Sequence, residues 1–337
     1  MDRRKHSGNR KTLSVHRIGA GIQSRVPSVI IRRAMAASTA NYGIRPGEAP
    51  WFSTLRVLER HVGALFAIIF VPLSMPLFWL AFASFAIRMF AIEGVNHRYF
   101  SHRAYKAGRF VQFMLALLAA QSGQRGSLWW ASKHRDHHKH AETDLDPHSP
   151  VSHSFLESYV AWFRRPQHAA CNLDAIPDFA KYPELRWLDR YYWIPFYAGA
   201  LLLFAACHYG FFGPRIDGTT GLLWGFYVPC FLVLHATSMI NTFAHMPGLP
   251  GGYRRYAVND RSVNRPALAL LTLGGGFHNN HHRFGAAARA GFAWYEIDIS
   301  YGVLRAMEAV GVIHDLKGAI PDDVLVEGGL RPKRSAP

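Results

Sequence analysis

Eight of the chain's nineteen histidines fall into three short motifs. The motif HRYFSH contains His97 and His102, HRDHH contains His134, His137 and His138, and HNNHH contains His278, His281 and His282. In a helix, residues i, i+3 and i+4 lie within about 100° of one another, so each HxxHH motif is expected to present three imidazoles on one helix face. Neutral imidazole is the commonest metal ligand in proteins. The three motifs together predict a metal centre.

Two metal ions are expected, because one first-row metal takes only roughly four to six ligands. A further ligand is indicated by the motif NTFAH, where Asn241 and His245 stand one helical turn apart. His140, which follows HRDHH, is expected to lie outside the centre. Zinc, copper and iron all accept imidazole, so the motifs alone leave the identity of the metal open.

Each motif follows an apolar segment, and four such segments are long enough to cross a membrane. They cover about residues 55–73, 77–97, 193–213 and 221–241, and a bilayer core requires about 20 residues of helix. The segment 110–122 is too short to span and is expected to form a helix at the membrane interface. We therefore predict an all-α integral membrane protein. Its four transmembrane helices form two hairpins under a cytoplasmic helical cap, which holds the dimetal site.

The chain is strongly basic, with a formal net charge of +16. Nine of its basic residues precede residue 41, against Asp2 alone. The positive-inside tendency places that end in the cytoplasm, and an even number of spans places the long 98–192 loop on the same side. This charge indicates contact with anionic lipid and not with nucleic acid. The excess of arginine over lysine favours a bacterial source, and hence the inner membrane.

Three regions are predicted along the chain. Residues 1–50 form a basic leader, in which Met35 is an alternative start to Met1. Residues 51–316 form the domain that contains the spans and the histidine motifs, and residues 317–337 form a polar tail.

The sequences HRYFSHRAYK, HRDHHKHAETDLDPH, NTFAH and GFHNNHHRF, in this order and position, resemble the membrane fatty acid desaturases of the stearoyl-CoA (delta-9) type. The resemblance covers roughly residues 55–316. It implies an enzyme that uses two iron ions (Fe2+), O2 and two external electrons to insert a cis delta-9 double bond into a saturated acyl-CoA. It also implies the iron ligands His97, His102, His134, His137, His138, His245, His278, His281 and His282, with Asn241 acting through a water molecule.

Two acidic residues are expected to support these ligands. Glu93 lies inside an apolar segment, where carboxylates are rare and usually functional. It precedes His97 by one helical turn and is expected to orient that imidazole. Asp146, in a DPH sequence that the family shares, is expected either to hold a ligand imidazole or to cap its own loop.

An acyl tunnel is expected beside the metal centre. Phe85, Met89 and Glu93 follow one another at four-residue steps and so form one row on a helix. Phe85 and Met89 are expected to close the far end of the tunnel. The resemblance implies that the position of Met89 is often small in the related enzymes, so a large residue there favours a chain shorter than stearoyl. Trp130 is expected to line the path and Gln121 to lie near the acyl carbonyl. The alternative for each of these residues is ordinary packing.

The acyl carrier stays open at this stage. The stearoyl-CoA type has an Arg-Asp pair immediately before the second histidine motif, where this chain has Ser132 and Lys133. Coenzyme A, an acyl-carrier protein and a membrane lipid are all candidates, and the chain length, double-bond position and oligomeric state are open too.

No haem, flavin or nicotinamide motif is visible, so the electrons must come from a partner, a ferredoxin or a b-type cytochrome with its reductase. Two other functions are kept in view. One is a membrane di-iron hydroxylase on the same scaffold, and the other is a non-catalytic membrane metal-binding protein.

Overall fold

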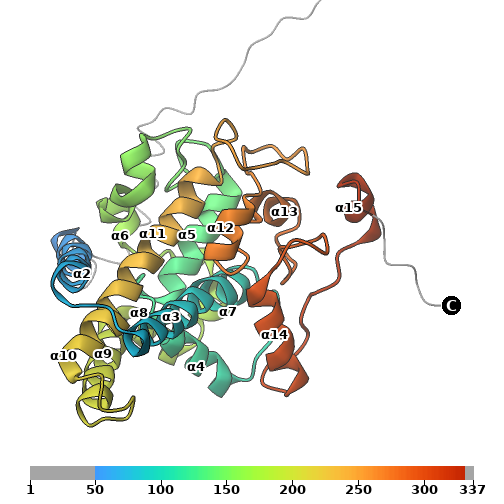
Figure 1. Ribbon diagram of the computed structural model, residues 1–337. Coiled ribbons are helices and arrows are strands. Elements are labelled where there is room, and N and C mark those ends of the chain that lie inside the picture. Colours follow the sequence, from blue (N-terminus) through green and yellow to red (C-terminus); the bar gives the residue numbers. More distant parts are fainter. Residues whose placement is uncertain (1–49, 331–337) are drawn as a thin grey trace, which may run out of the picture.

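The computed structural model describes residues 50–330, and this part of the chain is almost entirely helical (Figure 1). It contains no strand; three isolated bridges tie loops together, between Lys106 and His314, Tyr253 and Asn264, and Asn264 and Phe277. Residues 1–49, all but the last residue of the predicted basic leader 1–50, lie outside the described residues. The predicted all-α class is therefore confirmed for the residues that can be described.

The long helices fall where the four spans are predicted. They are α2 (Pro50–Phe70), α3 (Met75–Phe90) with its π-helical continuation η2 (Ala91–Ser101), α9 (Trp193–His208), and α11 (Val228–Phe243), which follows α10 (Gly218–Leu222) and the π-helical η6 (Leu223–Tyr227). The continuous stretches Met75–Ser101 and Gly218–Phe243 are long and apolar enough to cross a membrane, by length and composition. The arrangement of four spans in two hairpins stays a prediction.

Helix α2 fails the same test because its first half is charged. It contains Arg56, Glu59 and Arg60 within its first three turns. Its second half is apolar, and Ala64 and Ala67 pack in a buried cluster with residues of α3 and η6. Helix α9 is apolar throughout but has only 16 residues. The predicted third span, 193–213, is therefore helical only as far as His208.

The long helices present apolar side chains to their surroundings. The exposed large apolar side chains on α2, α3 and α9 include Leu55, Leu58, Val62, Leu65, Phe66, Ile68, Ile69, Phe70, Phe78, Trp79, Phe82, Ile87, Leu201 and Leu202. Contiguous apolar surface of this extent is rare on water-soluble monomers and marks contact with another apolar phase.

Shorter helices form the rest of the described chain. They are α4 (Arg109–Ala120), α5 (Ser127–His140), η3 (Glu157–Ala161), η4 (Trp162–Arg164), α6 (Pro166–Ala169), η5 (Leu173–Ala175), α7 (Pro177–Ala180), α8 (Pro183–Arg190), α12 (Pro266–Leu271), α13 (His278–Arg283), α14 (Ile299–Ala309) and α15 (Asp322–Glu327). Helix α4 forms at the predicted interfacial segment, and α15 lies in the predicted polar tail. Figure 1 shows α2, α9 and α10 on one side of the molecule and α14 and α15 on the other.

Helix α5 is the central element of the cap, and its position is fixed at both ends. Its first turn is capped by another helix, because the Asp189 carboxylate of α8 accepts a hydrogen bond from the backbone N–H of Trp129 at 2.8 Å. Further along, the Arg135 guanidinium donates to the backbone carbonyls of Phe100 and Ser101, at 2.9 and 2.8 Å. These bonds fix α5 against η2, so the first two histidine motifs face each other.

Candidate metal centre

Nine histidine side chains meet in the centre of the molecule and divide into two groups. In each group, one ligand nitrogen per residue lies within 4.8 Å of all the others. The five-histidine group consists of His97, His102, His134, His138 and His281. The four-histidine group consists of His137, His245, His278 and His282. His140 belongs to neither group.

Both HxxHH motifs are helical, as expected, but each one is shared between the two groups. In α5, His134 and His138 enter the five-histidine group and His137 enters the other. In α13, His278 and His282 enter the four-histidine group, whereas the middle residue, His281, enters the five-histidine group. Around a helix, residue i+4 lies about 40° from residue i in one direction, and residue i+3 lies about 60° from residue i in the opposite direction. One helix can therefore supply both groups, a division that we did not predict.

The ring nitrogens of the five-histidine group are too close and too many to be explained by hydrogen bonds. The Nε2 atom of His281 lies 3.0 Å from those of both His97 and His138, and His134 Nε2 lies 3.0 Å from His138 Nε2 and 2.8 Å from His102 Nε2. A neutral ring nitrogen carries either one hydrogen or one lone pair, so these four contacts cannot all be good hydrogen bonds. Ligand nitrogens about 2.1 Å from one ion lie about 3.0 Å apart at right angles. The observed spacing suits a shared metal ion.

The ring nitrogens of the four-histidine group show the same spacing, and one of them is buried without a hydrogen-bond partner. His278 Nε2 lies 2.9 Å from His245 Nε2 and 3.0 Å from His282 Nε2. His137 Nε2 is buried in the same group and has no hydrogen-bond partner. Buried polar atoms are nearly always paired, so this nitrogen indicates that the group is built around an ion.

The two acids predicted to support the histidines, Glu93 and Asp146, each contact the Nδ1 atom of one imidazole in the groups. Glu93 Oε2 lies 2.9 Å from His97 Nδ1, one turn away in η2. Asp146 lies 2.9 and 3.0 Å from His137 Nδ1 through its two oxygens. A neutral imidazole that donates from Nδ1 keeps its lone pair on Nε2, which is the atom that points into the group.

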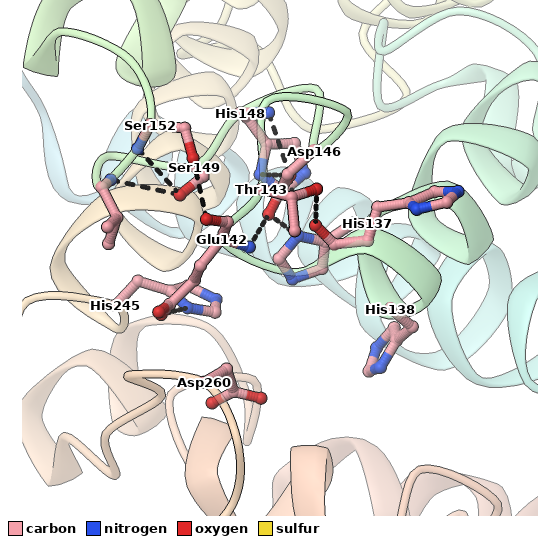
Figure 2. A network of polar contacts seen from close by, with 12 residues as sticks. His137, His138, Glu142, Thr143, Asp146, His148, Ser149, Ser152, His245 and Asp260 are labelled. Atoms are coloured by element: carbon pink, nitrogen blue, oxygen red, sulfur yellow. Dashed lines mark hydrogen bonds and ion pairs between the residues drawn. The ribbon is translucent and has the colours of Figure 1, made fainter. Parts of the chain in front are cut away.

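Asp146 contacts both the His137 imidazole and the backbone of its own loop. Besides His137, it accepts hydrogen bonds from the backbone N–H groups of Glu142, at 3.0 Å, and His148, at 3.1 Å. Figure 2 shows this carboxylate in the middle of the loop that follows α5. The loop therefore folds around the acid that orients a ligand imidazole.

Two further carboxylates contact the four-histidine group, and neither pairing was predicted from the sequence. Asp260 Oδ2 lies 2.7 Å from His282 Nδ1, and Glu142 Oε1 lies 3.4 Å from His245 Nδ1. Figure 2 shows Glu142 reaching from its loop to the His245 ring. Each acid is remote in sequence from its histidine, so no motif links the two.

The protonation states agree with metal binding. Burial, and then the neighbouring imidazoles, hold the pKa of His134, His138, His278 and His281 well below the ordinary value. These rings are therefore neutral at pH 7, the state in which imidazole binds a metal. Burial raises the pKa of Asp146, but the electrostatic attraction and the hydrogen bond of His137 outweigh this and hold that pKa below its usual range.

One cavity reaches the metal centre. Its wall includes His97, His134, His137, His278 and the predicted ligand Asn241. Asn241 thus faces the same space as residues of both groups, four residues before His245. No hydrogen bond of the described residues engages its side chain.

Of the four predicted tunnel residues, only Trp130 lines this cavity directly. Its indole N–H donates to Gln124 Oε1 at 3.3 Å, and the Gln124 amide donates to the Thr237 hydroxyl at 2.8 Å. Gln121 lies elsewhere, because its amide donates to the Pro195 carbonyl of α9 at 2.7 Å. The glutamine that lies at the cavity is therefore Gln124.

Phe85 and Met89 pack behind the cavity wall. They form one apolar cluster with Ile92 and with Val233 and Ala236 of α11. Ile92 itself lines the cavity. The two predicted tunnel-end residues thus lie behind Ile92, and their closing of an acyl tunnel stays a prediction.

Comparison with known proteins adds the family context. The family model described as "Fatty acid desaturase" matches residues 45–310. The chain is 30% identical over 279 residues to an sn-1 stearoyl-lipid 9-desaturase of Anabaena variabilis, covering 79% of this chain and 93% of the relative. It is 31% identical over 277 residues to an acyl-CoA C20 Delta5-desaturase of Anemone leveillei, covering 81% and 83%. A hex-5-enoyl-[acyl-carrier protein] acetylenase of Moorena producens is 28% identical over 270 residues, covering 76% and 81%.

Proposed function

Because the chain belongs to the fatty acid desaturase family, we propose that it is an O2-dependent desaturase that inserts a cis double bond at carbon 9 of a saturated acyl chain carried by coenzyme A. The observation that carries the proposal is the division of nine imidazoles into two groups with metal-ligand spacing, on the wall of one cavity. The named relatives act on lipid-bound, CoA-bound and carrier-protein-bound chains, so the carrier and the position are our own assignment.

We assign the ligands of two iron ions to the two groups. The five-histidine group holds one ion, and the four-histidine group holds the other, with Asn241 acting through a water molecule. When bound, the iron pair supplies oxidising power from O2 that no side chain has, which removal of hydrogen from an unactivated methylene requires.

The side chains of the protein prepare and protect this chemistry. Glu93, Asp146 and Asp260 each hold an imidazole with its Nε2 lone pair directed inward. Trp130 and Ile92 line the cavity beside the imidazoles and present apolar surface to an acyl chain. A chain held there is positioned relative to the ligand groups and shielded from water.

We propose that the four long helices span a bacterial inner membrane, with the metal centre on the cytoplasmic side. The support is the apolar surface of α2, α3 and α9 and the length of the stretches Met75–Ser101 and Gly218–Phe243. A soluble reduced ferredoxin, or a b-type cytochrome with its reductase, would then meet the basic cytoplasmic face and supply two electrons.

The test is the fatty-acid profile of a host that lacks its own desaturase and expresses this chain with a compatible reductant. We expect a new cis-monoene that disappears in His138→Ala and persists in the matched control His140→Ala, whose imidazole lies on the same helix outside both groups. Mass spectrometry of a derivatised extract gives the double-bond position. A hydroxylated acid in place of the alkene would contradict desaturation.

A further inference from the structure

Four cationic side chains line the cavity that contains the metal ligands. They are Arg56 and Arg60 of α2, Arg125 in the turn before α5, and Lys133 of α5. All four residues are more than nine-tenths buried. Glu93 is the one carboxylate of the described residues on the same wall, and it is engaged with His97. Among the described residues, the cationic side chains on this wall therefore outnumber the carboxylates.

The two arginines of α2 are the least compensated of these groups. Arg56 Nε and Nη2 and Arg60 Nε are buried without a hydrogen-bond partner. Arg60 donates once, to the Gly123 carbonyl at 2.9 Å. Glu59, on the same helix, accepts from Tyr197 at 2.6 Å, and neither arginine forms an ion pair with a described residue.

The two guanidinium groups line the same cavity and lie against the same aromatic ring. The Cζ atoms of Arg56 and Arg60 lie 5.2 and 5.1 Å from the centroid of the same ring, Phe196. Aromatic faces stabilise such cations only partly. A buried charge without a counter-ion is costly, so two of them in one cavity indicate that an anion enters it.

Arginine pairs suit phosphate, because a guanidinium donates through a planar fork and a phosphate offers several acceptor oxygens. Arg125 adds a third guanidinium nearby, itself donating to the neutral Ser53 hydroxyl at 2.7 Å and the Ala169 carbonyl at 2.6 Å. We propose that Arg56 and Arg60 bind a phosphate group of the acyl carrier while the acyl chain extends toward the metal centre. This inference rests on the proposed function only in assuming that the substrate is an acyl chain. It applies equally to a coenzyme A phosphate and to a phospholipid phosphodiester.

The test measures binding without turnover, using the full chain in nanodiscs under argon. Stearoyl-CoA, stearoyl phosphatidylglycerol and methyl stearate present the same acyl chain with a CoA phosphate, a lipid phosphate and no phosphate. We expect at least one phosphate-bearing ligand to bind at least tenfold more tightly than methyl stearate. Arg56→Met and Arg60→Met should remove that advantage, and Arg56→Lys should retain part of it.

Arg88→Met is the matched control, because Arg88 is equally buried in α3 but does not line the cavity. It should leave all three affinities unchanged, and an unchanged affinity for methyl stearate shows that each variant is folded. The phosphate ligand that loses affinity identifies the source, and either source supports the proposal. The proposal would be overturned if the wild-type protein bound methyl stearate as tightly as the phosphate-bearing ligands. It would also be overturned if Arg56→Met lowered the affinity for all ligands equally, or if free stearate bound as tightly as the phosphate-bearing ligands. Because O2 is absent, failure to desaturate leaves this result standing.

Discussion

At the scale of single residues, the second nitrogen of each ligand imidazole matters as much as the first. Glu93, Asp146 and Asp260 each lie within 3.0 Å of an Nδ1 atom whose ring directs Nε2 inward. Such partners fix the ring tautomer and raise the basicity of the ligand. The carboxylates are therefore expected to control metal retention without touching the metal.

Asp146→Asn tests this control. The amide keeps the size of the side chain but removes its charge, so His137 is oriented less strongly and we expect metal affinity to fall about 10- to 100-fold. Asp144→Asn is the matched control, since Asp144 lies two residues away in the same loop and is exposed. Iron per purified chain, titrated against a chelator, gives the result. Equal iron retention in both variants would mean that Asp146 serves the loop alone.

The division into two groups makes its own prediction. His282→Ala removes a ligand from the four-histidine group, whose other members are His137, His245 and His278. We expect the purified variant to lose one iron and keep the other, because the five-histidine group is complete without it. Iron analysis measures the ratio. Loss of both ions together would show that the two groups do not bind independently.

The sequence predicted the local partners of the ligands and missed the remote ones. Glu93 and Asp146 were foreseen because they lie four and nine residues from their histidines. Asp260 lies 22 residues from His282, and Glu142 lies 103 residues from His245. Their meeting depends on how the cap folds, which no local pattern encodes.

At the scale of elements, the position of α5 depends on a close contact with α8. A Cβ atom on Gly126 would lie 2.6 Å from the Asp189 Cα, so only glycine allows the two helices to approach. That approach lets Asp189 cap the first turn of α5. The helix that carries HRDHH is thereby held in place.

Gly126→Ala should therefore destabilise the protein by about 1–3 kcal/mol or more, because the added methyl group overlaps backbone. Gly108→Ala is the matched control: Gly108 is also the residue before a helix, α4, but nothing lies within 4 Å of its Cβ position. Thermal unfolding in detergent compares the two. An equal shift in Tm for both variants would remove the special role of the α5–α8 contact.

Helix positions were predicted well, and their internal geometry was not. The periodicity of the histidine motifs gave α5 and α13, but nothing in AIEGVNHRYFS distinguishes the π-helical η2 from an ordinary helix. The position of Gln121 away from the cavity has a similar origin. Helix α4 ends at Ala120, and the turn after it directs Gln124, not Gln121, to the cavity.

At the scale of the whole molecule, the proposed membrane layout predicts which loops face the cytoplasm. The two-hairpin layout places the loop after α9 outside the cytoplasm and the loop before α14 inside it. Tyr209 and Trp294 mark these loops, with 85% and 91% of their side chains exposed. The three native cysteines are buried and give little background labelling.

Single cysteines at these positions test the layout. Tyr209→Cys should react with a membrane-impermeant maleimide in intact cells, whereas Trp294→Cys should react only after the cells are opened. The measurement is mass-tagging of the chain on a gel. Labelling of both sites in intact cells, or of neither, would contradict an even number of spans with a cytoplasmic centre.

The most direct test of the whole account is a single turnover by the purified protein. The chain is loaded with iron, reduced by two electrons under argon, mixed with palmitoyl-CoA or stearoyl-CoA and exposed to O2, and the acyl products are counted. We expect about one cis-unsaturated chain for every two irons bound, and none from the His138→Ala variant. A fully loaded and reduced protein that bound the substrate but returned only saturated or hydroxylated chains would contradict it.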